Sequence, residues 1–191
     1  MSPTQSPLTV LRDATVLSVL VMAAAVGCAP PPSPAASADP GAADTDRAKR
    51  VHAMALDYEA RLPAVPQIEA GGLIEKNGAT SRSIVYVDCR TPRERAVSTL
   101  PGAVTPQELG ADPERYAGTD WVVYCTIGYR SSKLVERMRR QGFNATNLRG
   151  GVLAWAHAGG EFVTPEGEPT NRVHIYGRPW DLLPSGYEAK R

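Results

Sequence analysis

Short apolar runs alternate with helix-like stretches along the central part of the chain. The runs at 84–87 and 121–124 are continuous and contain β-branched residues, as expected of strands that are buried on both faces. Predicted strands lie at 65–68, 84–87, 103–105, 121–124 and 144–148, and predicted helices at 92–97, 113–117, 131–141 and 152–158. This alternation predicts an α/β fold, in which a central parallel sheet is covered by helices on both faces.

Hydrophobic spacing also defines the segments at either end of this pattern. Apolar positions recur on one face of a predicted N-terminal amphipathic helix at 47–63, which Pro63 would end. The alternating pattern covers 64–163, which we expect to form a single domain. The last segment, 164–191, contains many large apolar residues among Pro and Gly. We therefore expect it to pack on the domain, without regular structure.

The first 28 residues are typical of an export signal. An apolar stretch at 14–26 is short against the roughly 20 residues that span a bilayer as a helix. It leads into Ala25-Val26-Gly27-Cys28, which is similar to a bacterial lipobox, so Cys28 is the predicted lipidation site. An ordinary secretory signal with an incidental Cys28 is the alternative. The small, polar and proline residues of 29–46 predict a tether, and the whole pattern predicts an exported lipoprotein, anchored in the cell envelope through an N-terminal lipid.

Composition narrows the classes of function. The 191 residues include 21 basic and 20 acidic ones, for a formal net charge of +1, so a nucleic-acid-binding surface is not expected. An apolar fraction of 42% is enough for one core. The three histidines are scattered, and no Cys or His spacing indicates zinc, so we expect no metal and no other cofactor. No pattern in the sequence identifies a protein partner.

The strongest chemical signal is the segment Cys125–Ser131, directly behind the predicted strand at 121–124. A cysteine is followed by a loop that contains Gly128, and then by a predicted helix. Backbone N–H groups in such a loop and at a helix N-terminus bind anions and favour thiolate over thiol. Cys125 is therefore the candidate nucleophile. It lies at the carboxyl end of a predicted parallel strand, where the functional crevice of such sheets is found.

Several blocks of sequence resemble the rhodanese-like (sulfurtransferase) domain family. The run Val85–Glu94 is similar to the family's strand that ends in Asp-x-Arg, and Leu100–Ala103 is similar to its Ile-Pro-Gly-Ala turn. Cys125–Ser131 has the Cys-x-x-Gly-x-Arg-Ser form of the family's active-site loop. The closing blocks at 142–143, 148–151 and 154–155 also match, so the resemblance covers about 65–163. Two places differ: Ser98-Thr99 stand where Gly-His is usual, and Thr126 stands where thiosulfate-using members often have Arg.

The resemblance implies a rhodanese-type sulfurtransferase. Such an enzyme moves a sulfane sulfur from a small anion such as thiosulfate to a thiol or cyanide acceptor, through a persulfide that Cys125 would carry. Implied catalytic residues are Cys125 and Arg130, implied substrate-binding residues are Thr126, Ile127, Gly128, Tyr129 and Ser131, and implied supporting residues are Asp88 and Arg90.

Four questions stay open at the level of sequence. The chain could be a non-catalytic rhodanese-fold module that recruits a partner at the membrane. A cysteine-dependent phosphatase is disfavoured, because that class places five residues between Cys and Arg, whereas four separate Cys125 from Arg130. Arg130 could rigidify the loop through an ion pair with an acidic neighbour instead of binding the donor. Cys89 is either a small core residue or a redox partner of Cys125.

Overall fold

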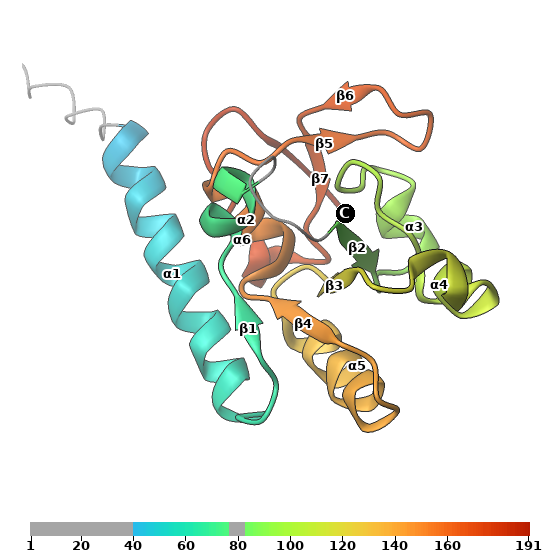
Figure 1. Ribbon diagram of the computed structural model, residues 1–191. Helices are drawn as coiled ribbons and strands as arrows, with labels where there is room; N and C mark the ends of the chain where they lie inside the picture. The colour runs from blue at the N-terminus through green and yellow to red at the C-terminus, as the bar shows by residue number, and fades with distance from the viewer. Residues whose placement is uncertain (1–39, 77–82) are drawn as a thin grey trace, which may run out of the picture. The chain divides into compact units, whose positions relative to one another are not determined.

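Four parallel strands form the central sheet, in the order β1–β4–β3–β2 (Figure 1). The structure, a computed structural model, describes residues 40–76 and 83–191, which belong to one compact unit. The strands are β1 (Gln67–Ile68), β2 (Ile84–Asp88), β3 (Asp120–Tyr124) and β4 (Ala145–Leu148). The helices are α1 (Pro40–Ala60), α2 (Ala70–Lys76), α3 (Pro92–Arg95), α4 (Pro106–Ala111), α5 (Tyr129–Arg140) and α6 (Gly151–His157), with short 3-10 helices η1 (Pro113–Tyr116) and η2 (Arg178–Trp180).

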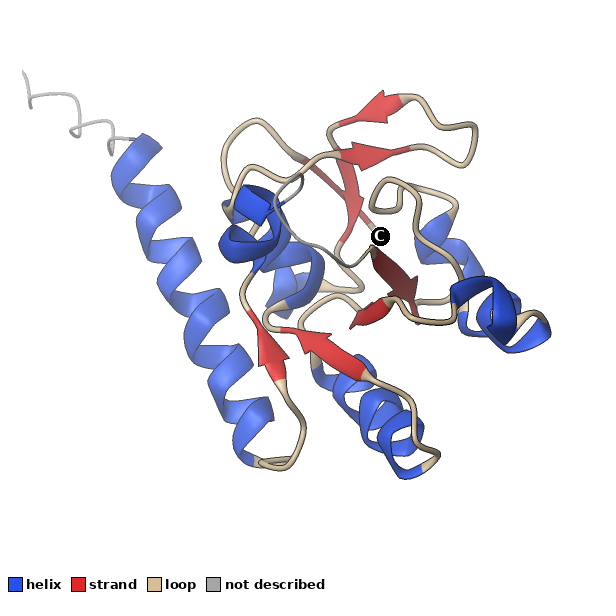
Figure 2. Ribbon diagram, in the orientation of Figure 1, coloured by secondary structure: helices blue, strands red, loops and turns tan. Residues whose placement is uncertain are grey.

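Helices cover both faces of this sheet, as the alternating sequence pattern predicts (Figure 2). Successive residues of a strand point to opposite faces. On β3, Val122 and Tyr124 join the apolar cluster that contains residues of α1 and α6, whereas Val123 joins a second cluster that contains Val135 of α5. The predicted edge strand at 65–68 is confirmed as β1, which lies at one end of the strand order. The fold class predicted from the sequence is therefore confirmed.

The N-terminal helix begins earlier than predicted. α1 starts at Pro40, so the end of the predicted tether at 29–46 is helical, and α1 ends at Ala60, short of the predicted 63. Proline is compatible with a first helical turn, where its missing N–H would have no intrahelical partner. Asp44 in the added turns accepts hydrogen bonds from Ser185 N at 2.9 and 3.0 Å. A contact with the distant C-terminal segment thus stabilises a helix start that the local sequence does not reveal.

The C-terminal segment packs on the domain, as predicted, but the prediction that it lacks regular structure is wrong. An antiparallel pair of strands, β5 (Phe162–Val163) and β6 (Pro169–Thr170), leads into it, and β7 (Arg172–His174) pairs in parallel with β8 (Glu188–Lys190). Ile175 and Leu182 are almost fully buried in the main apolar cluster. Strands of two or three residues are too short to produce a recognisable alternation in the sequence, and pairing between distant positions defines them.

Two short helices were missed, and one short strand is only a single bridge. α2 contains the pair Gly71-Gly72, which lowers helix propensity and hides the helix from a pattern search. α4 begins with a capping box, in which Thr105 and Glu108 each bond the other's backbone N–H, so a usable signal was present. The strand predicted at 103–105 reduces to one bridge between Val104 and Val87.

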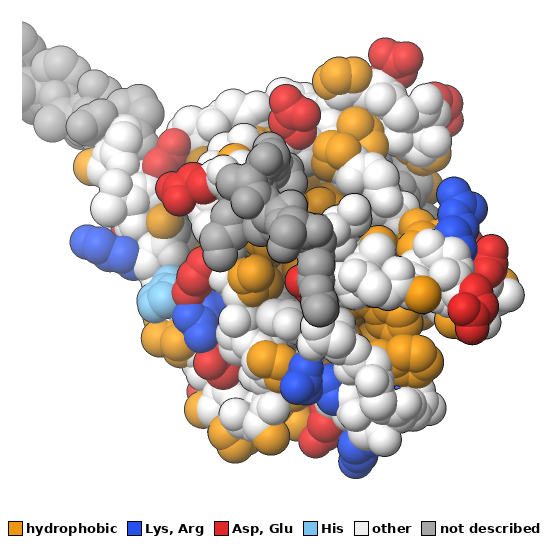
Figure 3. Space-filling view, viewed as in Figure 1, with side chains coloured by type: hydrophobic (Ala, Val, Ile, Leu, Met, Phe, Trp, Pro, Cys, Tyr) orange, Lys and Arg blue, Asp and Glu red, His pale blue; other side chains and the backbone are white. Residues whose placement is uncertain are grey.

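Three observations concern the predicted attachment of the protein to a membrane and the charge of its surface. Within residues 40–76 and 83–191, no helix is both long and apolar enough to cross a bilayer. Acidic and basic side chains lie intermixed over the face that Figure 3 shows. The predicted export signal at 1–28, with Cys28, and the tether as far as residue 39 lie outside the described residues, so the lipoprotein assignment stays a prediction.

Candidate active site

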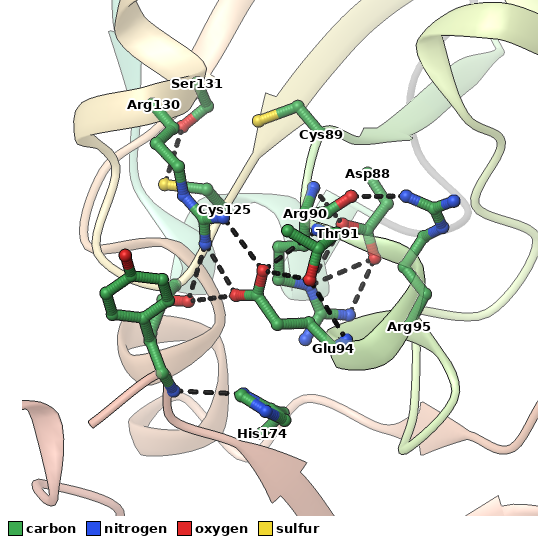
Figure 4. A network of polar contacts seen from close by, with 12 residues as sticks. Asp88, Cys89, Arg90, Thr91, Glu94, Arg95, Cys125, Arg130, Ser131 and His174 are labelled. Carbon is green, nitrogen blue, oxygen red and sulfur yellow. Dashed lines mark hydrogen bonds and ion pairs between the residues drawn. The ribbon is translucent and has the colours of Figure 1, made fainter. Parts of the chain in front are cut away.

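The loop that follows β3 surrounds the sulfur of Cys125 with hydrogen-bond donors. Gly128 N donates to Cys125 Sγ at 3.2 Å. Ser131 Oγ lies 3.5 Å from the same sulfur (Figure 4). The Cys125 residue is 1% exposed. α5 begins directly after Gly128, so the sulfur lies at the N-terminus of a twelve-residue helix, whose dipole favours a negative charge. This is the cradle that the sequence pattern predicts.

These donors make Cys125 acidic for a thiol. Burial by itself would raise its pKa, because it disfavours the charged form. Hydrogen bonds from Cys89 and Ser131, together with the positive charge of Arg130, outweigh burial and hold the pKa of Cys125 well below its usual value. A thiolate, and not a thiol, is the nucleophilic form of cysteine.

Two glycines let the chain pass close to this loop. Gly128 has a φ of 102°, in the region that favours glycine. Gly151 has a φ of 53°, and a Cβ atom there would lie only 2.2 Å from Cys125 O. Val152 N donates to the same carbonyl at 2.9 Å. The start of α6 therefore packs directly against the backbone of Cys125.

Arg130 forms a bidentate ion pair with Glu94 of α3. Its Nη1 and Nη2 lie 2.8 and 2.6 Å from the two carboxylate oxygens, and Thr126 Oγ1 donates to Glu94 at 3.0 Å (Figure 4). Burial raises the pKa of Glu94, but hydrogen bonds from Arg130 and Thr91 lower it more, to about 2. Arg130 thus forms the ion pair with an acidic neighbour that was one of the two alternatives open at the level of sequence. The acidic neighbour, Glu94, is a residue that sequence reasoning missed. Its place in the Thr91–Glu94 capping box was the available signal.

Asp88 and Arg90 form a second, fully buried ion pair at the end of β2. Arg90 Nη2 lies 2.7 Å from Asp88 Oδ2, and Arg90 N donates to Asp88 Oδ1 at 3.0 Å. Tyr124 Oη also donates to Asp88, at 2.7 Å, and so ties β2 to β3. Arg90 Nη2 continues to Ser98 O at 2.6 Å. This arrangement is of the supporting kind predicted for both residues.

Cys89 lies beside Cys125. Asp88 and Tyr124 are paired across β2 and β3, and each cysteine is the next residue along its chain. Both are free thiols. The single proton of Cys89 faces two acceptors, Tyr124 O at 3.2 Å and the Cys125 sulfur, and the nearby Cys125 raises the pKa of Cys89. Cys89 is therefore the protonated member of the pair, and redox pairing between the two stays a prediction.

A cavity of about 410 Å³ opens above the cysteine loop. Thr126, Ile127 and Tyr129 of the predicted substrate-binding set line it together with Cys125 and Arg130. Gly128 and Ser131 of that set lie beneath, against the Cys125 sulfur, and do not line the cavity. Substrate binding by this set stays a prediction. Four further lining residues come from segments where the sequence indicated no site: Tyr58, Arg61, Tyr176 and Trp180. Tyr176 is the one non-glycine residue with positive φ among residues 40–76 and 83–191, at 67°, a conformation that costs about 1–3 kcal/mol for such a residue. Tyr176 N donates to His174 Nδ1 at 3.0 Å, which supports this conformation.

The described residues include no group of three His, Cys, Asp or Glu side chains that could hold a metal ion. The groups around the Cys125 sulfur are backbone N–H groups, hydroxyls and the guanidinium of Arg130, which is paired with Glu94.

Comparisons with known proteins identify relatives over the central part of the chain. The rhodanese-like domain family matches residues 70–158. A sulfurtransferase of Allochromatium vinosum is 35% identical over 96 residues, which are 47% of this chain and 87% of that protein. YtwF of Bacillus subtilis is 30% identical over 95 residues, which are 48% of this chain and 90% of that protein. The crystal structure of a thiosulfate sulfurtransferase from Pseudomonas aeruginosa is 21% identical, with a TM-score of 0.49, and the match covers 63% of this chain and 24% of that one.

Fold, site and relatives together define the class. The molecule is an α/β domain with a central parallel sheet, whose thiolate-stabilising loop connects a buried strand to a helix. The chain belongs to the rhodanese-like family, and its relatives include proteins named as sulfurtransferases.

Proposed function

We propose that this protein is a sulfurtransferase that carries a sulfane sulfur on Cys125. The observation that supports this most directly is the placement of the Cys125 sulfur, 3.2 Å from Gly128 N at the N-terminus of α5. A structural cysteine has no need of such donors. The alternative of a non-catalytic module would leave them without a purpose.

The reaction follows from the thiolate. Cys125 S⁻ attacks the outer sulfur of the donor, an S–S bond forms, and the bond between the outer sulfur and the rest of the donor breaks with its electron pair. With thiosulfate as the donor, sulfite leaves and Cys125 retains a persulfide anion. An acceptor thiolate or cyanide then attacks the terminal sulfur, and Cys125 leaves as a thiolate again. The lowered pKa of Cys125 serves both steps, because the thiolate is the nucleophile in the first step and the leaving group in the second.

The loop would stabilise the charge through each step. Gly128 N and the Ser131 hydroxyl face the sulfur that is negative before attack, and the enlarged persulfide would use neighbouring N–H groups of the same loop. Arg130 would act by keeping the loop in shape through Glu94, and its positive charge also favours the thiolate. In this proposal Arg130 is a positioning residue.

Mass spectrometry of the intact protein tests the proposal. After incubation with a sulfane-sulfur donor, wild type should gain the mass of one sulfur atom, located on Cys125 by peptide mapping. Cys125→Ser should gain none, and its sulfur transfer should fall to background, with its fold unchanged by circular dichroism. Transfer by Cys125→Ser at close to the wild-type rate would overturn the mechanism.

We also propose that the protein is exported and anchored through a lipid on Cys28, since a lipobox-like segment follows a short apolar stretch. Metabolic labelling with a palmitate analogue should mark wild type and not Cys28→Ala, whose matched control is Cys89→Ala. Equal labelling of wild type and Cys28→Ala would reject the anchor. Several acyl chains anchor a protein stably, whereas one binds only marginally.

A further inference from the structure

The cavity above Cys125 is larger and more aromatic than an inorganic sulfur donor requires. Its volume of about 410 Å³ lies in the range of sites for organic ligands, which starts at roughly 300 Å³. Tyr58, Tyr129, Tyr176 and Trp180 line it, and three of these come from outside the segment 70–158 that matches the family. This part of the site is therefore supplied by segments that lie outside the family match.

The aromatic rings that line the cavity form two pairs. Tyr58 and Tyr129 lie with ring centroids 5.0 Å apart, and Tyr176 meets Trp180 edge-on at 5.3 Å. The Arg130 guanidinium lies over the ring of Tyr176, at 5.2 Å from its centroid. Tyr176 is 59% exposed, although large apolar side chains are usually buried, and its backbone is held in a left-handed conformation. An exposed ring held in a costly conformation at the mouth of a reactive site indicates contact with a ligand.

The charge around the cavity disfavours a dianion. Two cations line it, Arg130 and Arg61. Glu94 pairs with Arg130 through two short hydrogen bonds, so the attraction of Arg130 for a bound anion is largely offset. Arg61 pairs with Asp57 at 2.6 Å, and both side chains are largely exposed to water, which screens their interaction. The cavity thus presents at most one partly neutralised positive charge, whereas thiosulfate carries two negative charges.

We propose that the sulfur donor of this protein is an organic sulfane-sulfur compound with a planar apolar body and at most one negative charge. This inference rests on the proposed sulfur transfer at Cys125. The planar body would lie against Tyr176 and Trp180, and the sulfane sulfur would reach the Cys125 thiolate at the base of the cavity. The cavity would thus select the donor by its apolar body, and the loop would perform the chemistry.

Three sulfur donors separate the effect of the organic group from the effect of the donor's charge. Benzenethiosulfonate carries one negative charge and a phenyl ring, methanethiosulfonate carries one charge and a methyl group, and thiosulfate carries two charges and no organic body. The reaction balances in each case: Cys125 S⁻ takes the outer sulfur, the S–S bond of the donor breaks, and benzenesulfinate, methanesulfinate or sulfite leaves with the electron pair.

Binding is measured first, without turnover, by calorimetry with the full-length Cys125→Ser protein. We expect benzenethiosulfonate to bind about tenfold more tightly than methanethiosulfonate, because its ring is buried against aromatic side chains. We expect thiosulfate to bind most weakly. Equal affinity for the phenyl and methyl compounds, or tightest binding of thiosulfate, would overturn the proposal whether or not the protein transfers sulfur.

Tyr176→Gly then tests which residues carry the preference. Glycine accepts the positive φ, so the change removes the ring and keeps the backbone conformation. The ratio of kcat/KM for benzenethiosulfonate to that for methanethiosulfonate should fall about three- to tenfold. Phe143→Ala is the matched control, because Phe143 is a 38% exposed ring that stacks on Trp121, outside the cavity, and its ratio should equal that of wild type.

The two proposals fail in different ways. If no donor places sulfur on Cys125, sulfur transfer is wrong, and the calorimetric comparison still decides the nature of the ligand. If methanethiosulfonate and benzenethiosulfonate load Cys125 with equal efficiency, the sulfur chemistry stands and the aromatic donor site is rejected. A ratio that Tyr176→Gly leaves unchanged would likewise reject it.

Discussion

Cys125 shows how individual side chains set the reactivity of this site. Its sulfur is buried, which by itself opposes ionisation, yet donors from its own loop and from Cys89 stabilise the anion. Arg130 would be the obvious group to bind an anionic donor, but Glu94 already accepts hydrogen bonds from both of its terminal nitrogens. The consequence is a site in which hydrogen bonds, rather than a free cation, stabilise negative charge.

Cys89→Ala should raise the pKa of Cys125, because it removes a hydrogen bond that lowers that pKa. The thiolate forms above the pKa, so the midpoint of alkylation rate against pH should move to higher pH. Measurement of iodoacetamide reactivity across the pH range, with mass analysis of Cys125, gives the midpoint. Cys89→Ser is the control, since a hydroxyl also donates and should leave the midpoint close to that of wild type.

An unchanged midpoint in Cys89→Ala would make Cys89 a core residue alone. The redox prediction is separate: mild oxidation followed by non-reducing peptide mapping should yield a Cys89–Cys125 linked peptide, and its absence would reject the disulfide. Neighbouring thiols at the ends of paired strands are a geometry that such a bond needs.

At the scale of elements, the site is a junction of three pieces, of which β3 and α5 follow each other in the sequence and α6 comes later. β3 delivers Cys125, α5 begins around it, and the start of α6 packs on the backbone behind it. α3 adds Glu94 from the other side of the loop. Because each piece is anchored in a core of buried apolar residues, the loop is held from several directions and does not depend on its own few residues.

Gly151→Ala should destabilise the protein by about 2–4 kcal/mol, because a Cβ would lie 2.2 Å from Cys125 O and would require a left-handed backbone. Chemical denaturation gives the free energy of unfolding. Gly159 also has a positive φ, but a Cβ there would meet open space. Gly159→Ala therefore measures the cost of the left-handed backbone alone, which we expect to be about 1 kcal/mol.

Gly110→Ala completes the series, since Gly110 lies within α4 with open space and no positive φ, and should be neutral or stabilising by up to about 1 kcal/mol. Equal effects of Gly151→Ala and Gly159→Ala would mean that the loop yields to the extra atom, and that the close approach behind Cys125 is unimportant.

At the scale of the molecule, the segments outside the family match complete the domain. α1 and the residues after β6 both contribute to the main apolar cluster, and both reach the mouth of the cavity, through Tyr58, Tyr176 and Trp180. The chain also ends against the domain, where Arg93 Nη2 donates to Arg191 O at 3.1 Å. The family domain supplies the cysteine loop, and the segments outside the family match supply part of the cavity lining above it.

Ile175→Ala should lower the free energy of unfolding by about 2–5 kcal/mol, because Ile175 is 0% exposed and its truncation leaves a cavity. Tyr176→Gly, one residue along, should lower it by no more than about 1 kcal/mol, since the ring is exposed and glycine relieves the left-handed backbone. If Ile175→Ala changes the free energy of unfolding as little as Tyr176→Gly does, the C-terminal segment does not belong to the cooperatively folded core.

The parallel α/β architecture and the candidate nucleophile Cys125 could both be predicted from the sequence. Both depend on local patterns: a buried strand of continuous apolar residues, a glycine-containing loop and an amphipathic helix follow one another within 121–141. The tertiary structure alone decided the pairing of Glu94 with Arg130, the early start of α1, the strands of the C-terminal segment and the aromatic mouth around Tyr176. These features are contacts between residues far apart in the chain, which leave no periodicity, and the energy of packing rather than local propensity selects them.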